Sequence, residues 1–250
     1  MSINPFVPQW IHQMADSDQA VAFFAYQSLL ESVLRTRDEA EQSELAAALG
    51  EALTAQAKSG GAGSFRDNAF LAAAALETAN PLHPPLVRNH LARLLGYLPV
   101  EKAVPPLAAA LQDLEAREMA RQSLERLPAP QATAALISAL NAPGPVFCTG
   151  IIASLAARGG PQSLSAIVKA ADDPQPEIRA AAVMALGAFP DPSLDAILER
   201  HNAPVARARL AATLRSAGNK DASDHIYKSL LAGNAPEAQK KAAHLALQSS

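Results

Sequence analysis

The amino-acid sequence predicts an all-α protein, a right-handed α-solenoid of about seven antiparallel helical hairpins. Three observations predict this fold. A short phrase recurs at steps of 28 to 32 residues, and self-similarity at such a period is typical of stacked helical repeats. Apolar residues make up 49% of the chain but aromatic residues only 4%, so alanine, the best helix former, supplies much of the apolar content. Finally, prolines stand where helices would begin and end.

The recurring phrase reads Pro-x-(Val/Ile)-Arg, then small and apolar residues, then Leu-Gly. It is clearest at residues 85–96 and 176–187. Proline suits the first turn of a helix, where its missing N–H has no partner to lose. Apolar residues at positions three, seven, ten and eleven of the phrase fall on one helical stripe, and the glycine is expected to let the chain leave the helix. Position one of the phrase falls at Pro85, Leu114, Pro145, Pro176, Pro204 and Pro236.

Each of the later phrases is preceded by a shorter apolar segment that predicts a first helix. Two helices joined by a short turn form an antiparallel hairpin, in which the helix of the phrase is the second helix. The predicted first helices cover residues 104–111, 132–140, 163–171, 194–200 and 222–231.

Residues 1–80 are less regular and are predicted to be atypical N-terminal capping helices. Asp18 and Asp38 are predicted N-caps of helices over residues 19–35 and 39–57. A glycine-rich connection at 59–64 leads to a further helix over about 65–78. The acidic start of the second helix suits a terminal unit, which needs a polar outer side. Residues 81–250 are predicted to form the repeats, as a single continuous solenoid.

The phrase resembles the HEAT-like repeats of bacterial proteins, particularly the short type found in phycobilin-lyase subunits. The best match runs from Asp173 to Arg179, and the likeness covers residues 81–250 well and 18–80 loosely. The resemblance implies the solenoid fold. It leaves the function open, because such repeats serve scaffolds, adaptors, lyases and a few enzymes.

The same resemblance implies a ladder of ion pairs, in which an Asp before each second helix pairs with the Arg of the phrase. Asp173 and Arg179 keep both partners. A continuous ladder is not expected, because other residues stand at the offset of Asp173 in the remaining copies. These are Leu82, Leu111, Ala142, His201 and Gly233.

Charge and composition bound the class of partner. The formal net charge is −3, with 4 basic and 10 acidic side chains in residues 1–80 against 17 and 14 in residues 81–250. A general nucleic-acid binder needs a basic excess, so nucleic acid is a disfavoured partner. The start of the chain does not resemble a secretory signal, and no apolar run is long enough to span a membrane. The sequence therefore predicts a cytoplasmic protein with no membrane partner.

No pattern predicts catalysis, a metal or a cofactor. The six histidines lack metal-binding spacing and do not form the His-Glu dipeptides of the HEAT-like di-iron hydroxylase. Cys148 has apolar neighbours and is interpreted as a small structural residue. The glycines of 60–63 lack a following Lys-Ser or Lys-Thr and are interpreted as a linker. Near the start, Phe6 and Trp10 either cover the first open helical face or form a partner-docking peptide.

A binding surface is expected where the second helices line the inner curve of the solenoid. Side chains at positions five, six and nine of the phrase should face it, giving an apolar centre between basic edges. A helix or extended peptide with apolar anchors and acidic ends would suit this surface. The alternative interpretation is that the alanines there reflect helix propensity alone. The predicted binding residues are Asn89, His90, Arg93, Glu118, Met119, Arg121, Gln122, Thr149, Ala153, Ala180, Met184, Arg209, Lys240 and Lys241.

The predicted function is therefore a non-catalytic scaffold or adaptor that binds another protein or peptide on its concave face. The resemblance leaves one alternative, a chromophore or prosthetic-group lyase-type subunit. Nucleic-acid binding is the second alternative. The sequence makes no prediction of the oligomeric state.

Overall fold

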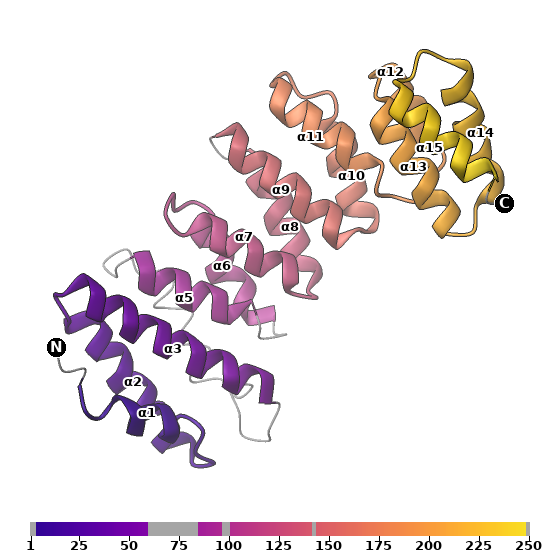
Figure 1. Cartoon of the computed structure of the whole chain (residues 1–250). Helices are drawn as coiled ribbons and strands as arrows, with labels where there is room; N and C mark the ends of the chain where they lie inside the picture. The colour runs from indigo at the N-terminus through magenta and orange to yellow at the C-terminus, as the bar shows by residue number, and fades with distance from the viewer. Residues whose placement is uncertain (1–3, 60–84, 97–100, 142–143, 249–250) are drawn as a thin grey trace. The chain divides into compact units, whose positions relative to one another are not determined.

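The structure of the protein, a computed structural model, describes residues 4–59, 85–96, 101–141 and 144–248 (Figure 1). These residues form helices and short turns and contain no strand, so the prediction of an all-α solenoid is confirmed. By its internal contacts the chain divides into two units, Met1–Leu136 and Ile137–Ser250. The predicted helix over 65–78 and residues 60–64 of the glycine-rich connection lie outside the described residues.

The first unit consists of two N-terminal hairpin helices with a short helix against them, followed by repeats. In Figure 1, α1 lies beside α2, and the contacts run from α2 to α3, from α3 to α5 and from α5 to α7. A 3₁₀ turn over Glu101–Ala103 leads into α6. The helices among the described residues of this unit are α1 (Val7–Gln13), α2 (Gln19–Arg35), α3 (Glu39–Ser59), α5 (Pro85–Leu95), α6 (Val104–Ala110) and α7 (Arg117–Arg126), and α8 (Pro130–Ala139) continues past Leu136.

The second unit stacks second helices on one another, with first helices packed against them. Its second helices, α9, α11, α13 and α15, contact one another in that order, and α10, α12 and α14 pack against them as first helices. The bounds are α9 (Pro145–Arg158), α10 (Gly160–Ala170), α11 (Pro176–Leu186), α12 (Leu194–Arg200), α13 (Pro204–Ser216), α14 (Lys220–Ala232) and α15 (Glu237–Gln248). None of the helices in the described ranges has the length and apolar character needed to cross a membrane.

The predicted N-caps are confirmed. The Asp18 carboxylate accepts a hydrogen bond from the backbone N–H of Ala20 at 2.8 Å, and that of Asp38 accepts from Glu41 at 2.9 Å. The copy of the phrase that starts at Leu114 differs from the others, because its helix begins three residues later. There the Asp113 carboxylate accepts a hydrogen bond from the N–H of Glu115 at 3.0 Å. This bond stabilises a turn at the point where the other copies have proline.

The glycine of the phrase allows close helix packing and, contrary to the prediction, does not serve to end the helix. Gly187 has φ −62° and ψ −10°, an ordinary right-handed conformation, so it is not needed to turn the chain out of α11. A Cβ on Gly187 would instead lie 2.7 Å from the carbonyl oxygen of Ala206, in the next second helix. A Cβ on Gly96 would lie 2.6 Å from the Cβ of Ser123. The glycine is present because successive second helices approach too closely for a side chain.

Replacing Gly187 by Ala should therefore lower the free energy of unfolding. Alanine is the better helix former by about 1 kcal/mol, but its Cβ must push α11 from α13, and such overpacking costs about 1–3 kcal/mol. Urea unfolding followed by circular dichroism measures the difference. A variant as stable as the wild type, or more stable, would contradict the close approach.

Two of the arginines at position four, Arg88 and Arg207, are buried between helices and pair with acidic side chains outside the implied ladder. Arg207 is 8% exposed. Its Nε and Nη2 donate to the two carboxylate oxygens of Asp195 at 2.7 and 2.9 Å, which raises the pKa of Arg207. It also reaches Glu199 at 3.3 Å and the Ser229 hydroxyl, in α14, at 3.1 Å. Arg207 thus joins its own hairpin to the next one.

The arginines at position four of two other copies, Arg88 and Arg179, have different partners. Arg88, 6% exposed, pairs with Asp113 and with Glu115 in the turn before α7. Arg179 donates to the backbone carbonyl of Asp173 at 2.7 Å, whereas the Asp173 carboxylate accepts from the N–H of Gln175 at 2.8 Å. The two residues of the implied pair therefore meet through the backbone of Asp173.

Replacing Arg207 by Met should lower the free energy of unfolding by about 2–3 kcal/mol, because the Asp195 carboxylate, with a side chain only 16% exposed, loses its partner. The matched control is Arg209→Met, on the exposed side of the same helix, which should change stability by less than about 0.5 kcal/mol. Thermal and urea unfolding measure both variants. Equal losses would contradict a specific role for the buried pair.

Candidate functional site

The predicted binding residues of the first unit lie on two neighbouring second helices. Asn89 and Arg93 are on α5, and the side chain of His90 lies outside the description. Arg93 and Glu118 are exposed. The Asn89 amide donates to the carbonyl of Glu115 at 3.3 Å, which ties α5 to the turn before α7. The four predicted residues on α7 are Glu118, Met119, Arg121 and Gln122.

The α7 residues are engaged with one another. The Arg121 side chain is only 12% exposed and pairs with Glu118 and with Glu125. Gln122 donates to the Glu118 carboxylate at 3.0 Å. The hydrogen bond from Arg121, helped by that from Gln122, lowers the pKa of Glu118 against the opposing effect of burial. The Arg121 charge is thus balanced within α7, which leaves Arg93 as the exposed cation among the predicted residues of this unit.

In the second unit, the structure brings four predicted residues together. Thr149, Ala153, Met184 and Arg209 line one hollow of about 330 Å³ between α9, α11 and α13. Its remaining walls are apolar, from Ile152, Ala156, Ala157, Ala181, Ala185 and Ala188. We call this exposed side of the three helices the second-helix face. Ala180 is exposed on α11, and Lys240 and Lys241 lie on α15, but none of these three lines the hollow.

The hollow follows from the small residues. Alanine carries no atom beyond Cβ, so a run of alanines on α9 and α11 leaves the surface between the helices depressed. Met184 is 40% exposed, and its unbranched, polarizable side chain can adapt to a partner. Arg209 is the charged side chain among the lining residues. The arrangement suits an apolar side chain with a negative group beside it.

Sequence reasoning missed two exposed apolar residues on the same helices. Val146 on α9 is 83% exposed and Val205 on α13 is 46% exposed. Both occupy position two of the phrase, which stands seven residues before position nine and therefore lies on the same helical face. That spacing was the available signal. The second-helix face is thus more apolar than predicted.

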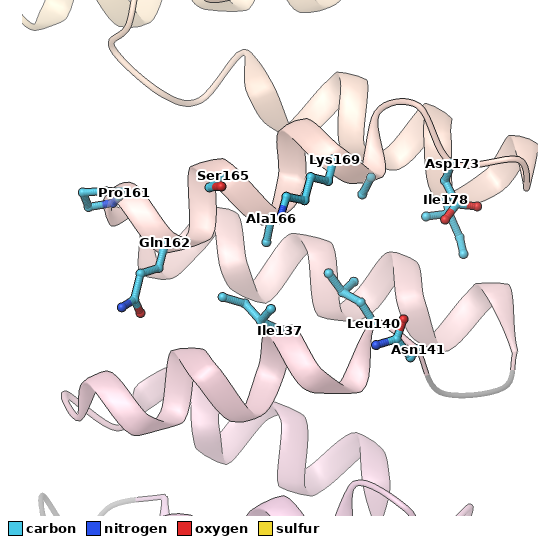
Figure 2. Close-up of a pocket in the computed structure, with 11 residues that line it drawn as sticks. Ile137, Leu140, Asn141, Pro161, Gln162, Ser165, Ala166, Lys169, Asp173 and Ile178 are labelled. Carbon is cyan, nitrogen blue, oxygen red and sulfur yellow. The ribbon is translucent and has the colours of Figure 1, made fainter.

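A second, larger hollow lies on the first helices of this unit. Figure 2 shows Ile137 and Leu140 on one side of it, with Gln162, Ala166 and Lys169 on the other. Its volume is about 600 Å³. We call it the first-helix hollow. The sequence analysis placed binding residues on the second helices alone and did not predict it.

Among the described residues, no group of three or more His, Cys, Asp or Glu side chains is placed to hold a metal ion. Cys148 is 2% exposed, and its Sγ lies 3.4 Å from the carbonyl oxygen of Leu140, as a structural cysteine would.

Residues 149–215 match the protein family described as HEAT repeats. This range contains most of α9, all of α10, α11 and α12, and α13 up to its last residue. The resemblance expected from the phrase is therefore confirmed, and this part of the chain consists of HEAT repeats. No curated protein is significantly similar to the chain in sequence.

Among solved structures, the chain is similar to the complex of CpcE and CpcF of phycocyanin lyase from Nostoc sp., at 21% identity over 98% of this chain and 94% of that one, with a TM-score of 0.38. It is also similar to human deoxyhypusine hydroxylase in complex with glycerol, at 17% identity over 97% and 94%, with a TM-score of 0.32. These TM-scores mean that neither structure superposes closely on this chain.

Replacing Arg121 by Gln should raise the pKa of Glu118, because it removes the hydrogen bond that lowers this pKa most. The control, Arg117→Gln, removes only a weaker charge interaction and should raise it less. Carboxyl carbon chemical shifts measured across a pH titration report both values.

Because the pKa of Glu118 is lowered in the folded state, the free energy of unfolding depends on pH in a defined direction. The folded state binds the Glu118 proton less tightly than the unfolded state does. The Glu118–Arg121 pair therefore stabilises the fold at a pH above the ordinary glutamate pKa, and this stabilisation disappears as the pH falls through the lowered pKa of Glu118. The stability difference between wild type and Arg121→Gln should accordingly shrink in acid. A difference that grows in acid would contradict this assignment.

Proposed function

We propose that the protein is a non-catalytic scaffold or adaptor, and that it binds a helix or extended peptide of another protein on its second-helix face. The observation that carries the proposal is the hollow lined by Thr149, Ala153, Met184 and Arg209, which lies within the stretch that consists of HEAT repeats. HEAT repeats, as a class, suggest protein binding. Exposed apolar surface that is rimmed by polar groups marks such interfaces.

The geometry favours one kind of partner. At about 330 Å³, the hollow has the size for a single large apolar side chain with its neighbours, which a helix presents at i, i+3, i+4 and i+7. Val146 and Val205 add further apolar contact on either side of α11. A carboxylate of the partner would pair with exposed Arg209, and Lys240 and Lys241 on α15 add positive charge that steers an acidic segment toward this unit.

The rival functions predict other behaviour. A nucleic-acid binder would contact successive phosphates through a groove with several basic side chains. The hollow has one basic side chain in its lining, Arg209. Such a protein would be retained on heparin in a salt-sensitive way. A lyase-type subunit for a chromophore or prosthetic group would carry a retained or coloured ligand on purification.

The double variant Ala153→Asp, Met184→Asp should lose its partner. Two carboxylates in the apolar hollow would lose their hydration under the partner, and Arg209 could pair with only one of them, which should weaken binding by at least about a hundredfold. The measurement is capture from extract of the native cell with quantitative mass spectrometry, followed by binding of the purified partner.

The control places one carboxylate in the first-helix hollow, at exposed Ser165. Ser165→Asp should bind the partner like the wild type, with circular dichroism confirming that all variants fold. Loss with Ser165→Asp instead would move the site to the first-helix hollow. Unchanged binding by the double variant would rule out the second-helix face.

A further inference from the structure

A separate hollow in the N-terminal hairpin carries chemistry that the proposed function does not use. It has a volume of about 470 Å³ and lies among α1, α2 and α3. Trp10, the only tryptophan of the chain, lines it. Its other lining residues are Asn4, Ser28, Glu31, Ser32, Arg35, Thr36, Glu41 and Leu45. We propose that this hollow binds an organic cation, an ammonium or guanidinium group on an apolar stem.

The walls of the hollow are held firmly in place. Val7 and Met14, 5% and 3% exposed, anchor α1 on the hairpin, and Trp10 between them stacks on Phe6 with ring centroids 6.1 Å apart. The turn between α2 and α3 is fixed by Gln42, whose amide donates to the carbonyl of Val33 at 3.0 Å. These contacts hold the indole ring and the first turn of α3 in fixed positions before any ligand arrives.

The charges of the hollow leave a negative balance. Glu31 pairs with Arg35 one helical turn away, so these two charges offset each other. Glu41, half-buried in the first turn of α3, makes no side-chain hydrogen bond or ion pair with any residue that the structure describes. Over residues 1–59 the sequence holds 3 basic and 8 acidic side chains, so the surrounding field also attracts cations.

The Ser28 and Thr36 hydroxyl groups can accept hydrogen bonds from a ligand but have no proton left to donate to it. The Ser28 hydroxyl donates its proton to the carbonyl of Phe24 at 2.8 Å, and the Thr36 hydroxyl donates to that of Ser32 at 2.9 Å. A hydroxyl with its one proton engaged can only accept further hydrogen bonds. The hollow therefore offers hydroxyl and carboxylate acceptors, which match the three donors of an ammonium or the five of a guanidinium.

The aromatic and apolar walls select an organic cation. A cation near an indole ring is attracted by the ring quadrupole, and Leu45, buried at 2% exposure, offers apolar contact to a stem. A hydrated metal ion would gain nothing from the apolar wall, which an organic stem can contact. The cation can be a free amine or the side chain of a lysine or arginine in another protein, and the chemistry of recognition is the same.

The test uses the single indole N–H of Trp10 as a reporter. Butylammonium and butylguanidinium chloride are titrated into the ¹⁵N-labelled full chain at constant ionic strength. Each should shift the Trp10 indole signal saturably, with an apparent Kd of about 1 mM. Butanol, which keeps the apolar stem without the charge, should bind at least about tenfold more weakly.

Glu41→Gln should weaken the binding of both cations about tenfold, because it removes the uncompensated carboxylate and keeps the shape. The matched control is Glu39→Gln, an exposed carboxylate of the same helical turn that does not line the hollow. It should bind like the wild type. Retained amide spectra show that both variants fold.

Absence of a saturable shift up to about 50 mM, butanol binding as well as the cations, or wild-type binding by Glu41→Gln would each overturn the proposal. An acetylated Gly-Arg-Gly amide distinguishes the two sources. Tighter binding than butylguanidinium supports a side chain of another protein, and weaker binding supports a free amine. The site lies in the first unit, so these outcomes are independent of those for the second-helix face.

Discussion

The constraint on which the structure depends is the close approach of successive second helices. A Cβ at Gly96 or Gly187 would fall within 2.7 Å of atoms of the next helix, so these helices meet almost backbone to backbone. The approach buries the apolar stripe completely: Ala206, Leu210 and Leu214 on α13 are all 0% exposed. In a solenoid each repeat is stabilised chiefly by its neighbours, so a side chain at either glycine would act on the contact that holds neighbouring repeats together.

Buried arginines provide the polar counterpart of that contact. Arg207 bridges α12, α13 and α14, and Arg215, about two turns further along α13, also joins neighbouring helices. Arg215 pairs with Asp224, donates to the carbonyl of Ala246 at 2.5 Å and lies 5.5 Å from the centre of the Tyr227 ring. Arg207 and Arg215 are engaged within the fold, so neither is free to contact a phosphate backbone.

Local signals predicted the helices well, and contacts between repeats were predicted poorly. The limits of α2 and α12 and the caps at Asp18 and Asp38 follow from residues within one turn of each helix end, which a sequence displays directly. The partners of the position-four arginines do not, because Asp195 precedes Arg207 by 12 residues while Glu115 follows Arg88 by 27. The role of Gly187 was likewise invisible, since it depends on Ala206 in another repeat. For the binding residues, the spacing placed Thr149, Ala153, Met184 and Arg209 on one face, but it omitted Val146 and Val205 by counting only three positions of the phrase.

The N-terminal aromatic residues show how one short segment can serve two purposes. Covering the first open helical face requires apolar side chains directed into the hairpin, and Val7 and Met14 meet that need with almost no exposure. Trp10 is only half-buried, and it lines the same hollow as carboxylate and hydroxyl groups, which are not needed to cover an apolar face. Phe6, 56% exposed, contributes a stacked ring that limits how far the indole can move. Different residues of the segment therefore have different surroundings: the aliphatic side chains are buried against the hairpin, and the indole lines a polar hollow that also contains the Glu41 carboxylate.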